Sequence, residues 1–242
     1  MKRTRKLFSD INKNAKPVAK RDKIIIDEQD ISAIVTRRIL AETEFFDNGN
    51  LISLSESTNL DSDDITHFTN ITNLYDVVKI IRRLFKLPKG TNEWDEDNIQ
   101  NFKNNVEDFL NDAFTNKEEY KSFFIDKTIS LNELRNNNSY LLFRPVGFLL
   151  FAKLYVEFKK CNKLDYFISN INKICFQLPE SPFNKVLWNK GKMETKGVNQ
   201  TLAFELCLYL LNSFPVNKEQ ELLTKYRNII KNDDENLPLK VV

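Results

Sequence analysis

The sequence predicts a mainly α-helical protein with two or three short strands near its N-terminal end. Only five glycines and seven prolines occur in 242 residues, which favours helices over a turn-rich β architecture. Apolar residues also recur at helical spacing along most of the chain. A hydrophobic content of 41% with 29% charged residues is ordinary for a globular protein, and the length suits one large domain or two small ones.

The short strands are expected mainly within the first 54 residues. Residues 24–26 are three isoleucines bounded by polar residues, a β-branched run that predicts a buried strand. Asp27 follows this run at a position suited to capping the next helix. Residues 51–54 are a second strand candidate, and residues 140–143 are expected to be a strand or an extended segment.

Most of the remaining chain has the periodicity of amphipathic helices. We expect helices at residues 28–46, 71–87, 95–114, 117–124, 146–160, 164–174, 199–212 and 216–230. The helix at 146–160 is apolar nearly all round, so it should be the central buried helix. Residues 133–139 are polar and rich in asparagine, which predicts an exposed loop.

Arg144 stands directly before the most apolar helix of the chain. A cation beside such a segment needs a partner, because burying an unpaired charge is costly. Two interpretations follow, an anion-binding site or a buried ion pair, and of these we expect the ion pair.

The charge is small overall but unevenly distributed. The formal net charge is only +2, yet residues 1–23 hold nine Lys or Arg against two acids. The helix at 71–87 also has a basic face. Such segments either contact phosphates or are solvated faces, and charge alone does not separate the two. The candidate DNA contacts are Arg3, Arg5, Lys6, Lys20, Arg37, Arg38, Arg82 and Arg83.

Residues for catalysis or metal binding are scarce. The three cysteines are far apart in the sequence, no CxxC occurs and His67 is the single histidine, so we expect no zinc site. The common phosphate-binding glycine loops and the GxSxG nucleophile motif are also missing from the sequence. We therefore expect no enzyme, no catalytic residues, no metal and no cofactor. The odd cysteine count, without a secretory leader, predicts a cytoplasmic location, and the apolar runs are too short for a membrane span.

Two segments carry a family resemblance. Residues 6–40, KLFSDINKNAKPVAKRDKIIIDEQDISAIVTRRIL, contain the pattern F-x-x-x-N-x-x-A-K-P, and the second segment is LWNKGKMETKGVNQTLAFELCLYLL at residues 187–211. Both resemble the DGQHR-domain family, and within it the DndB-like regulators encoded with genes for DNA phosphorothioation, the sulfur modification of DNA. The positions that match the family pattern are Phe8, Asn12, Lys16, Pro17, Trp188, Gly191 and Lys192.

The resemblance implies a division of the chain. The DGQHR half of the family is related to the ParB-like α/β fold, so residues 1–54 would be the end of that region and residues 55–242 a helical C-terminal domain. The motif that names the family lies upstream of the matching segment in other members and does not occur here. The chain therefore resembles the C-terminal portion of a longer member, either as a fragment or as a naturally short form.

The resemblance and the charge distribution together predict a DNA-binding transcriptional regulator of a phosphorothioation gene cluster. Its expected partners are double-stranded DNA, at the promoter of its own cluster, and other proteins of the modification system; a homo-oligomer is left open. Two alternatives remain. One is a ParB-like nucleotide-handling or nuclease subunit whose catalytic residues lie in the missing upstream half. The other is a protein-interaction subunit of a phage-defence complex.

Overall fold

The computed structural model describes residues 18–55, 57, 60–61, 64–85, 94–137, 139–180 and 182–242. Within these ranges the chain is mainly helical, as predicted, and its regular strands are two-residue segments. β1 (Ile52–Ser53) pairs in parallel with β2 (Thr69–Asn70) near the N-terminal end. β3 (Trp188–Asn189) and β4 (Lys192–Met193) form an antiparallel pair in the C-terminal half.

The first half of the chain forms helices that pack around α4. Its elements are α2 (Lys20–Ile26), α3 (Ile31–Glu42), the 3-10 turn η1 (Glu44–Phe46), α4 (Ile71–Ile81) with its 3-10 extension η2 (Arg82–Leu84), α5 (Glu96–Asn116) and α6 (Glu118–Phe124). Asn70 caps α4 by accepting a hydrogen bond from the backbone of Asn73, and Asp95 caps α5 in the same way through Asn98.

The second half of the chain is arranged around α7. Its elements are the π-helical turn η3 (Glu133–Asn137), the 3-10 turn η4 (Leu141–Phe143), α7 (Pro145–Lys160), α8 (Leu164–Asn170), η5 (Ile171–Lys173), α9 (Gly197–Leu210), η6 (Val216–Lys218) and α10 (Glu219–Ile230). Pro145 is the first residue of α7, where its missing N–H costs nothing.

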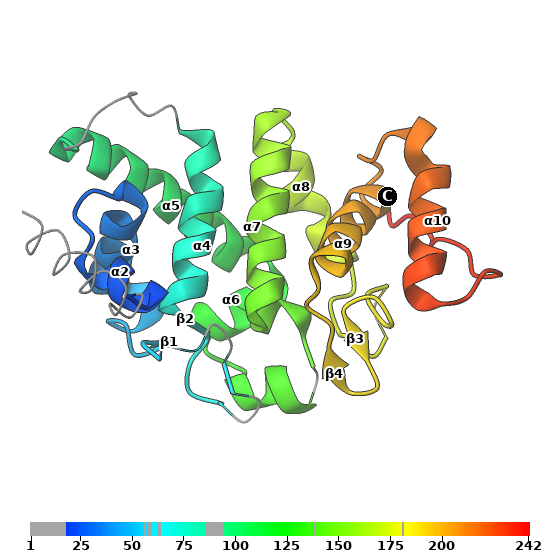
Figure 1. Ribbon diagram of the computed structural model, residues 1–242, viewed down its shortest axis with the longest axis horizontal. Coiled ribbons are helices and arrows are strands. Elements are labelled where there is room, and N and C mark those ends of the chain that lie inside the picture. The colour runs from blue at the N-terminus through cyan, green and yellow to red at the C-terminus, as the bar shows by residue number, and fades with distance from the viewer. Residues whose placement is uncertain are drawn as a thin grey trace, which may run out of the picture.

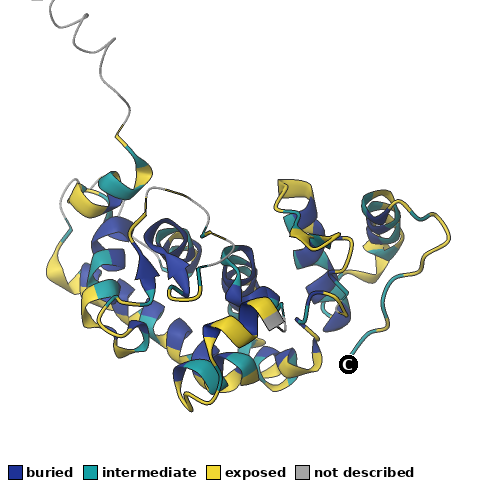
Figure 2. Ribbon diagram, turned by 90° about the horizontal axis from the view of Figure 1, so that it is seen from below, coloured by how far each residue is buried: buried dark blue, intermediate teal, exposed yellow. Residues whose placement is uncertain are grey.

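The helix α7 lies at the centre of the molecule, as its apolar sequence predicted. It stands between α4 and α9, runs in the same direction as α4, and also contacts α8 (Figure 1). Ten of its sixteen residues are buried. The helices turn their buried surfaces toward one another and their exposed surfaces outward (Figure 2). No helix in the described part of the chain has both the length and the apolar character needed to cross a bilayer.

An aromatic cluster fixes the start of α7 against the segment that precedes α4. The ring centroid of Phe68, just before β2, lies 5.1 Å from that of Phe148 on α7 and 4.9 Å from that of Phe124 on α6. All three rings are buried, and both contacts are edge-to-face. Such contacts add to the stabilisation from burial, so this end of α7 is held in a defined position.

The predicted strand at residues 24–26 is wrong, because these isoleucines form the end of α2. Only Ile24 is buried, whereas Ile26 is 66% exposed, so the run has one apolar face rather than two. Asp27 does not cap a helix at residue 28. Its carboxylate accepts hydrogen bonds from the backbone N–H groups of Gln29 and Asp30, and Asp30 is the residue that caps α3.

Two further local predictions are wrong. In the segment 140–143, Tyr140 forms an isolated bridge to Gln177, and the next three residues are the 3-10 turn η4. Residues 133–137, within the expected exposed loop at 133–139, form η3, which turns the side chain of Arg135 into the interior; residue 138 lies outside the described residues.

Candidate functional site

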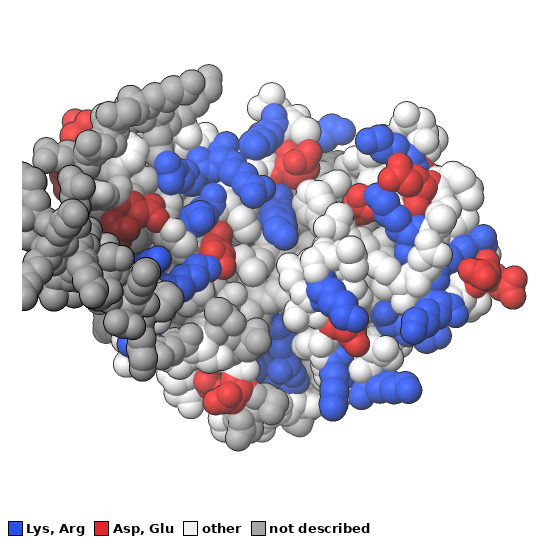
Figure 3. Space-filling model, in the orientation of Figure 1, with Lys and Arg blue, Asp and Glu red and all other residues white. Residues whose placement is uncertain are grey.

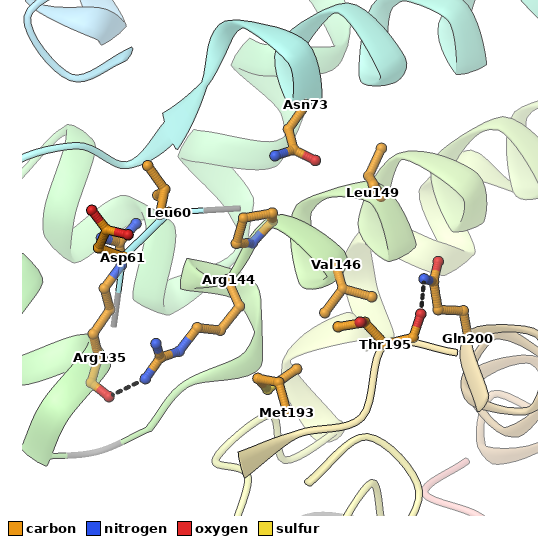
Figure 4. Close-up of a pocket in the computed structure, with 11 residues that line it drawn as sticks. Leu60, Asp61, Asn73, Arg135, Arg144, Val146, Leu149, Met193, Thr195 and Gln200 are labelled. Carbon is orange, nitrogen blue, oxygen red and sulfur yellow. Dashed lines mark hydrogen bonds between the residues drawn. The ribbon is translucent and has the colours of Figure 1, made fainter. Parts of the chain in front are cut away.

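A pocket of about 370 Å³ lies between the first turns of α4 and α7 and the segment that leads into α9. Arg135 and Arg144 lie on one side of it, while Val146, Thr195 and Gln200 lie on the other (Figure 4). Three sequence-distant parts of the chain therefore meet here. The pocket combines cationic groups with an apolar wall from the first turn of α7.

Arg135 ties together the elements that form the pocket. Its side chain is 2% exposed, and its Nε–H donates to the carbonyl of Phe143, 2.9 Å away. Its Nη1 donates to the carbonyl of Asp64 and its Nη2 to that of Phe68, at 2.7 Å. Burial and the neighbouring charge of Arg144 lower the pKa of Arg135 to about 10. The residue thus stays cationic at neutral pH and joins η4 to the loop before α4.

Gly147 sets the position of Arg144. A Cβ atom on Gly147 would lie 1.9 Å from the carbonyl oxygen of Leu141, so only glycine lets η4 approach the first turn of α7 this closely. The sharp step from η4 into α7 places Arg144 between the two elements, directly before Pro145. The local sequence therefore fixes where this guanidinium enters the pocket.

Arg144 is partly buried and has no carboxylate partner within 4 Å in the described part of the chain, so the expected buried ion pair is wrong. Its Nη2 donates to the backbone carbonyl of Arg135, 2.8 Å away. Its Nε–H is shielded from solvent and has no hydrogen-bond partner among the described residues. Burial lowers the pKa of Arg144. Asp61 is exposed at the edge of the pocket and pairs with neither arginine.

A second carboxylate, Asp64, shapes the loop that receives Arg135. Its Oδ1 accepts hydrogen bonds from the backbone of Thr66 and His67, both 2.9 Å away, and its Oδ2 lies 2.8 Å from His67 Nδ1. Burial opposes ionisation of Asp64, but these hydrogen bonds hold its pKa below the ordinary value of 3.8. Asp64 and His67 thus stabilise the loop whose carbonyls accept from Arg135.

The candidate DNA contacts are placed in three different ways. Arg3, Arg5 and Lys6 lie outside the described residues. Three others each bind a carboxylate of this chain: Lys20, Arg37 and Arg38. Arg82 and Arg83 lie together in η2, at the C-terminal end of α4.

These three cations find their hydrogen-bond acceptors within the chain itself. Lys20 Nζ lies 2.8 Å from both carboxylate oxygens of Asp76. Arg37 donates to the carbonyls of Ile24 and Asp27 and to the carboxylate of Glu28, and so closes the α2–α3 corner. Arg38 donates hydrogen bonds to both carboxylate oxygens of Glu96 at the start of α5. These contacts give all three cations a structural role.

Arg82 and Arg83 belong to a group of like charges that we call the basic ridge, defined as Lys79, Arg82, Arg83 and Lys153. Lys79 precedes the two arginines by one helical turn, so the three lie on one face. Lys153 of α7 is partly buried; burial lowers its pKa and the charge of Arg83 lowers it further. Basic side chains gather over the upper ends of α4 and α7 (Figure 3). The closest carboxylate to Arg82 is that of Asp30, 4.0 Å away.

The family-motif positions have no shared site in the described structure. Phe8, Asn12, Lys16 and Pro17 lie outside the described residues. Trp188 is half-buried in β3, Lys192 is exposed in β4, and Gly191 forms the turn between them with a φ of +77°. This hairpin lies next to the pocket, which Met193 of β4 helps to line.

Sequence reasoning missed Arg135, the most buried cation of the pocket. One signal could have indicated it: Leu131 and Leu134 are spaced by three residues, and both are buried. Their spacing is helical, which argues against an exposed loop at this point. In the described part of the chain no three His, Cys, Asp or Glu side chains gather as metal ligands would.

Comparison of the chain with family models, with curated proteins and with solved structures gave no match. The DGQHR-family assignment therefore stays a prediction from the two sequence segments.

Proposed function

We propose that this chain is a DNA-binding transcriptional regulator of the DndB-like, DGQHR-family type, acting in the cytoplasm on the promoter of its own phosphorothioation gene cluster. The family resemblance supplies the biological role. The observation that carries the DNA-binding part is the basic ridge on α4 and α7.

The ridge has the properties of a phosphate-binding surface. Lys79 and Arg83 are exposed, and neither forms an ion pair within 4 Å in the described structure. Lys20, Arg37 and Arg38 are already engaged by carboxylates of the chain, so their charge is compensated locally. Exposed cations without a carboxylate partner, such as Lys79 and Arg83, attract a polyanion, and this attraction weakens as salt screens it. Such contacts position a protein on DNA, while base contacts supply sequence preference.

The test is fluorescence anisotropy of the whole chain with its own upstream promoter duplex and with a scrambled duplex, across a salt series. The variant is Lys79→Gln with Arg83→Gln, which removes the two exposed ridge charges and keeps polar side chains at both positions. The matched control is Lys121→Gln with Lys173→Gln, which removes two exposed charges on α6 and η5.

We expect the native chain to prefer the promoter duplex and to lose affinity steeply with salt. The ridge variant should bind more weakly, and its salt slope should be shallower by about one for each lost phosphate contact. The control variant should keep the native slope. An unchanged salt slope in the ridge variant would show that the ridge does not contact DNA phosphates. Equal affinity for both duplexes would contradict a regulator of this promoter.

A further inference from the structure

We propose that the pocket between α4 and α7 binds a small organic anion. Its carboxylate or phosphate group lies against Arg144, and its apolar part lies against the first turn of α7. This site is separate from the basic ridge and does not depend on DNA binding.

The positive charge of the two pocket arginines is only partly compensated. Arg135 and Arg144 are adjacent; burial and their mutual repulsion disfavour the cationic state of Arg135, and the more distant carboxylate of Asp64 offsets this only in part. The surrounding described residues place no carboxylate within 4 Å of either guanidinium. Buried cations in proteins are ordinarily paired with an anion, since an isolated charge is costly to remove from water. A bound anion supplies the missing partner.

The two arginines differ in how many of their N–H donors are already used by the protein. Arg135 directs its Nε and both terminal nitrogens to three backbone carbonyls, so it serves as a structural tie. Arg144 makes one hydrogen bond to the described residues, from Nη2, while its Nη1 donates to none of them; its Nε–H is shielded from solvent and is not available to a ligand in the pocket. Guanidinium groups bind carboxylates and phosphates through pairs of N–H donors. Arg144 is therefore the residue with donors left for a ligand.

The pocket has the size and the mixed polarity of a small-molecule site. Its volume of about 370 Å³ lies at the lower end of the usual range for small-molecule sites. Pro145, Val146 and Leu149 contribute an apolar wall from the start of α7. An inorganic ion would leave that wall uncovered, and a DNA duplex is too wide to enter. An organic anion with a compact apolar body satisfies both parts of the pocket.

The experiment is isothermal titration calorimetry of the whole chain with four probes. Phenyl phosphate and benzoate carry the two anionic groups on the same ring, benzyl alcohol is the neutral control, and inorganic phosphate is the anion without the apolar part. We expect one site per chain for phenyl phosphate or benzoate, with the tighter of the two identifying the preferred group. Benzyl alcohol and inorganic phosphate should bind at least tenfold more weakly than the better aryl anion.

Two variants locate the site. Arg144→Gln should weaken the aryl anion at least tenfold while circular dichroism stays native. Thr195→Trp introduces a bulky ring at an exposed residue of the pocket and leaves both arginines unsubstituted, and it should block binding as well. Lys121→Gln, on α6, should bind as the native chain does. If Arg144→Gln does not fold, the tryptophan variant alone decides the location.

Three outcomes would overturn the inference. The first is no detectable binding of either aryl anion at millimolar concentration. The second is equal affinity in the native chain and both pocket variants. The third is equal affinity for the aryl anions and benzyl alcohol, which would show that the arginines do not select the ligand.

Discussion

The two basic regions of this molecule lie at opposite ends of the α4–α7 pair and place their charge in different surroundings. The basic ridge occupies the C-terminal end of α4, where Lys79 and Arg83 face solvent. The pocket occupies the N-terminal ends of both helices, where Arg135 is buried and Arg144 is partly buried. Solvent stabilises Lys79 and Arg83, whereas the pocket cations depend on carbonyl groups and on any ligand that enters the pocket.

This difference separates two uses of positive charge. Exposed cations cost little to maintain and act over a Debye length, which suits the attraction of a polyanion. Buried cations act at short range and only on a group that fits. Substitutions at the ridge should therefore weaken DNA binding with little effect on stability. In the pocket, substitution of Arg135 should lower stability, whereas substitution of Arg144 should weaken binding of the organic anion.

The largest effect should come from Gly147→Ala, which tests whether the pocket end of α7 is as tightly built as its geometry indicates. The new Cβ would lie 1.9 Å from the carbonyl oxygen of Leu141, and backbone must move to relieve the clash. We expect a loss of about 4 kcal/mol in the free energy of unfolding, measured by urea denaturation. Gly197→Ala is the control, because its Cβ meets nothing within 4 Å. Equal stability in both variants would contradict the close approach of η4 and α7.

A smaller but still large effect should distinguish Arg135 from Arg83. Arg135→Gln removes donors from the carbonyls of Asp64, Phe68 and Phe143 in a buried site. We expect a loss of about 3 kcal/mol in the free energy of unfolding, because hydrogen bonds to charged groups are strong and unsatisfied buried acceptors are costly. Arg83→Gln on the exposed ridge should change stability by less than about 0.5 kcal/mol. Similar losses in the two variants would erase the distinction between a structural and a solvated cation.

Most of the helical architecture could be predicted from apolar spacing, and α7 shows why. Its apolar residues surround the helix, which indicated a central buried position, and the structure confirms it. The short α2 was missed because β-branched isoleucines favour strands locally, while one-sided burial against the neighbouring helices decides the outcome. The π-helical turn η3 was missed because its polar sequence suggested a loop.

The candidate site was only partly predictable. Arg144 stood out in the sequence because a cation next to an apolar helix needs a partner, but its hydrogen-bond acceptor proved to be a backbone carbonyl. Arg135 gave no such signal, since its acceptors are carbonyls of residues 64, 68 and 143 that no side-chain pattern links to it. The spacing of Leu131 and Leu134 could indicate a helical turn at this point, but contacts to backbone carbonyls depend on tertiary structure and cannot be read from it.

Substitution of Arg144 should change the free energy of unfolding only slightly in the absence of a ligand. Arg144→Gln removes one hydrogen bond to the carbonyl of Arg135 but also removes a desolvated charge beside a second cation. The two effects are each about 1 kcal/mol and opposite in sign, so stability should stay within about 1 kcal/mol of the native value. A loss as large as that of Arg135→Gln, in the same denaturation assay, would assign Arg144 a structural role.

The smallest effect should be the pH dependence that Asp64 contributes. Because its folded-state pKa is lowered below 3.8, its stabilisation is present above that pH and is lost as pH falls through the lowered value. Asp64→Ala should lower the free energy of unfolding by about 1 kcal/mol at pH 7, comparable to removal of a helix cap. The difference in free energy of unfolding between this variant and the native chain should become smaller toward about pH 2. Asp61→Ala, at an exposed position nearby, should show no such narrowing. A difference that is constant with pH would contradict the role of the ionised carboxylate.

The most direct test of the separation between ridge and pocket is a crossed titration. Phenyl phosphate and the promoter duplex would each be titrated into Arg144→Gln and into the ridge variant Lys79→Gln/Arg83→Gln. We predict that Arg144→Gln loses at least tenfold in affinity for phenyl phosphate and keeps its affinity for the duplex, while the ridge variant does the reverse. A parallel loss of both ligands in either variant would contradict two distinct regions and indicate a single basic surface.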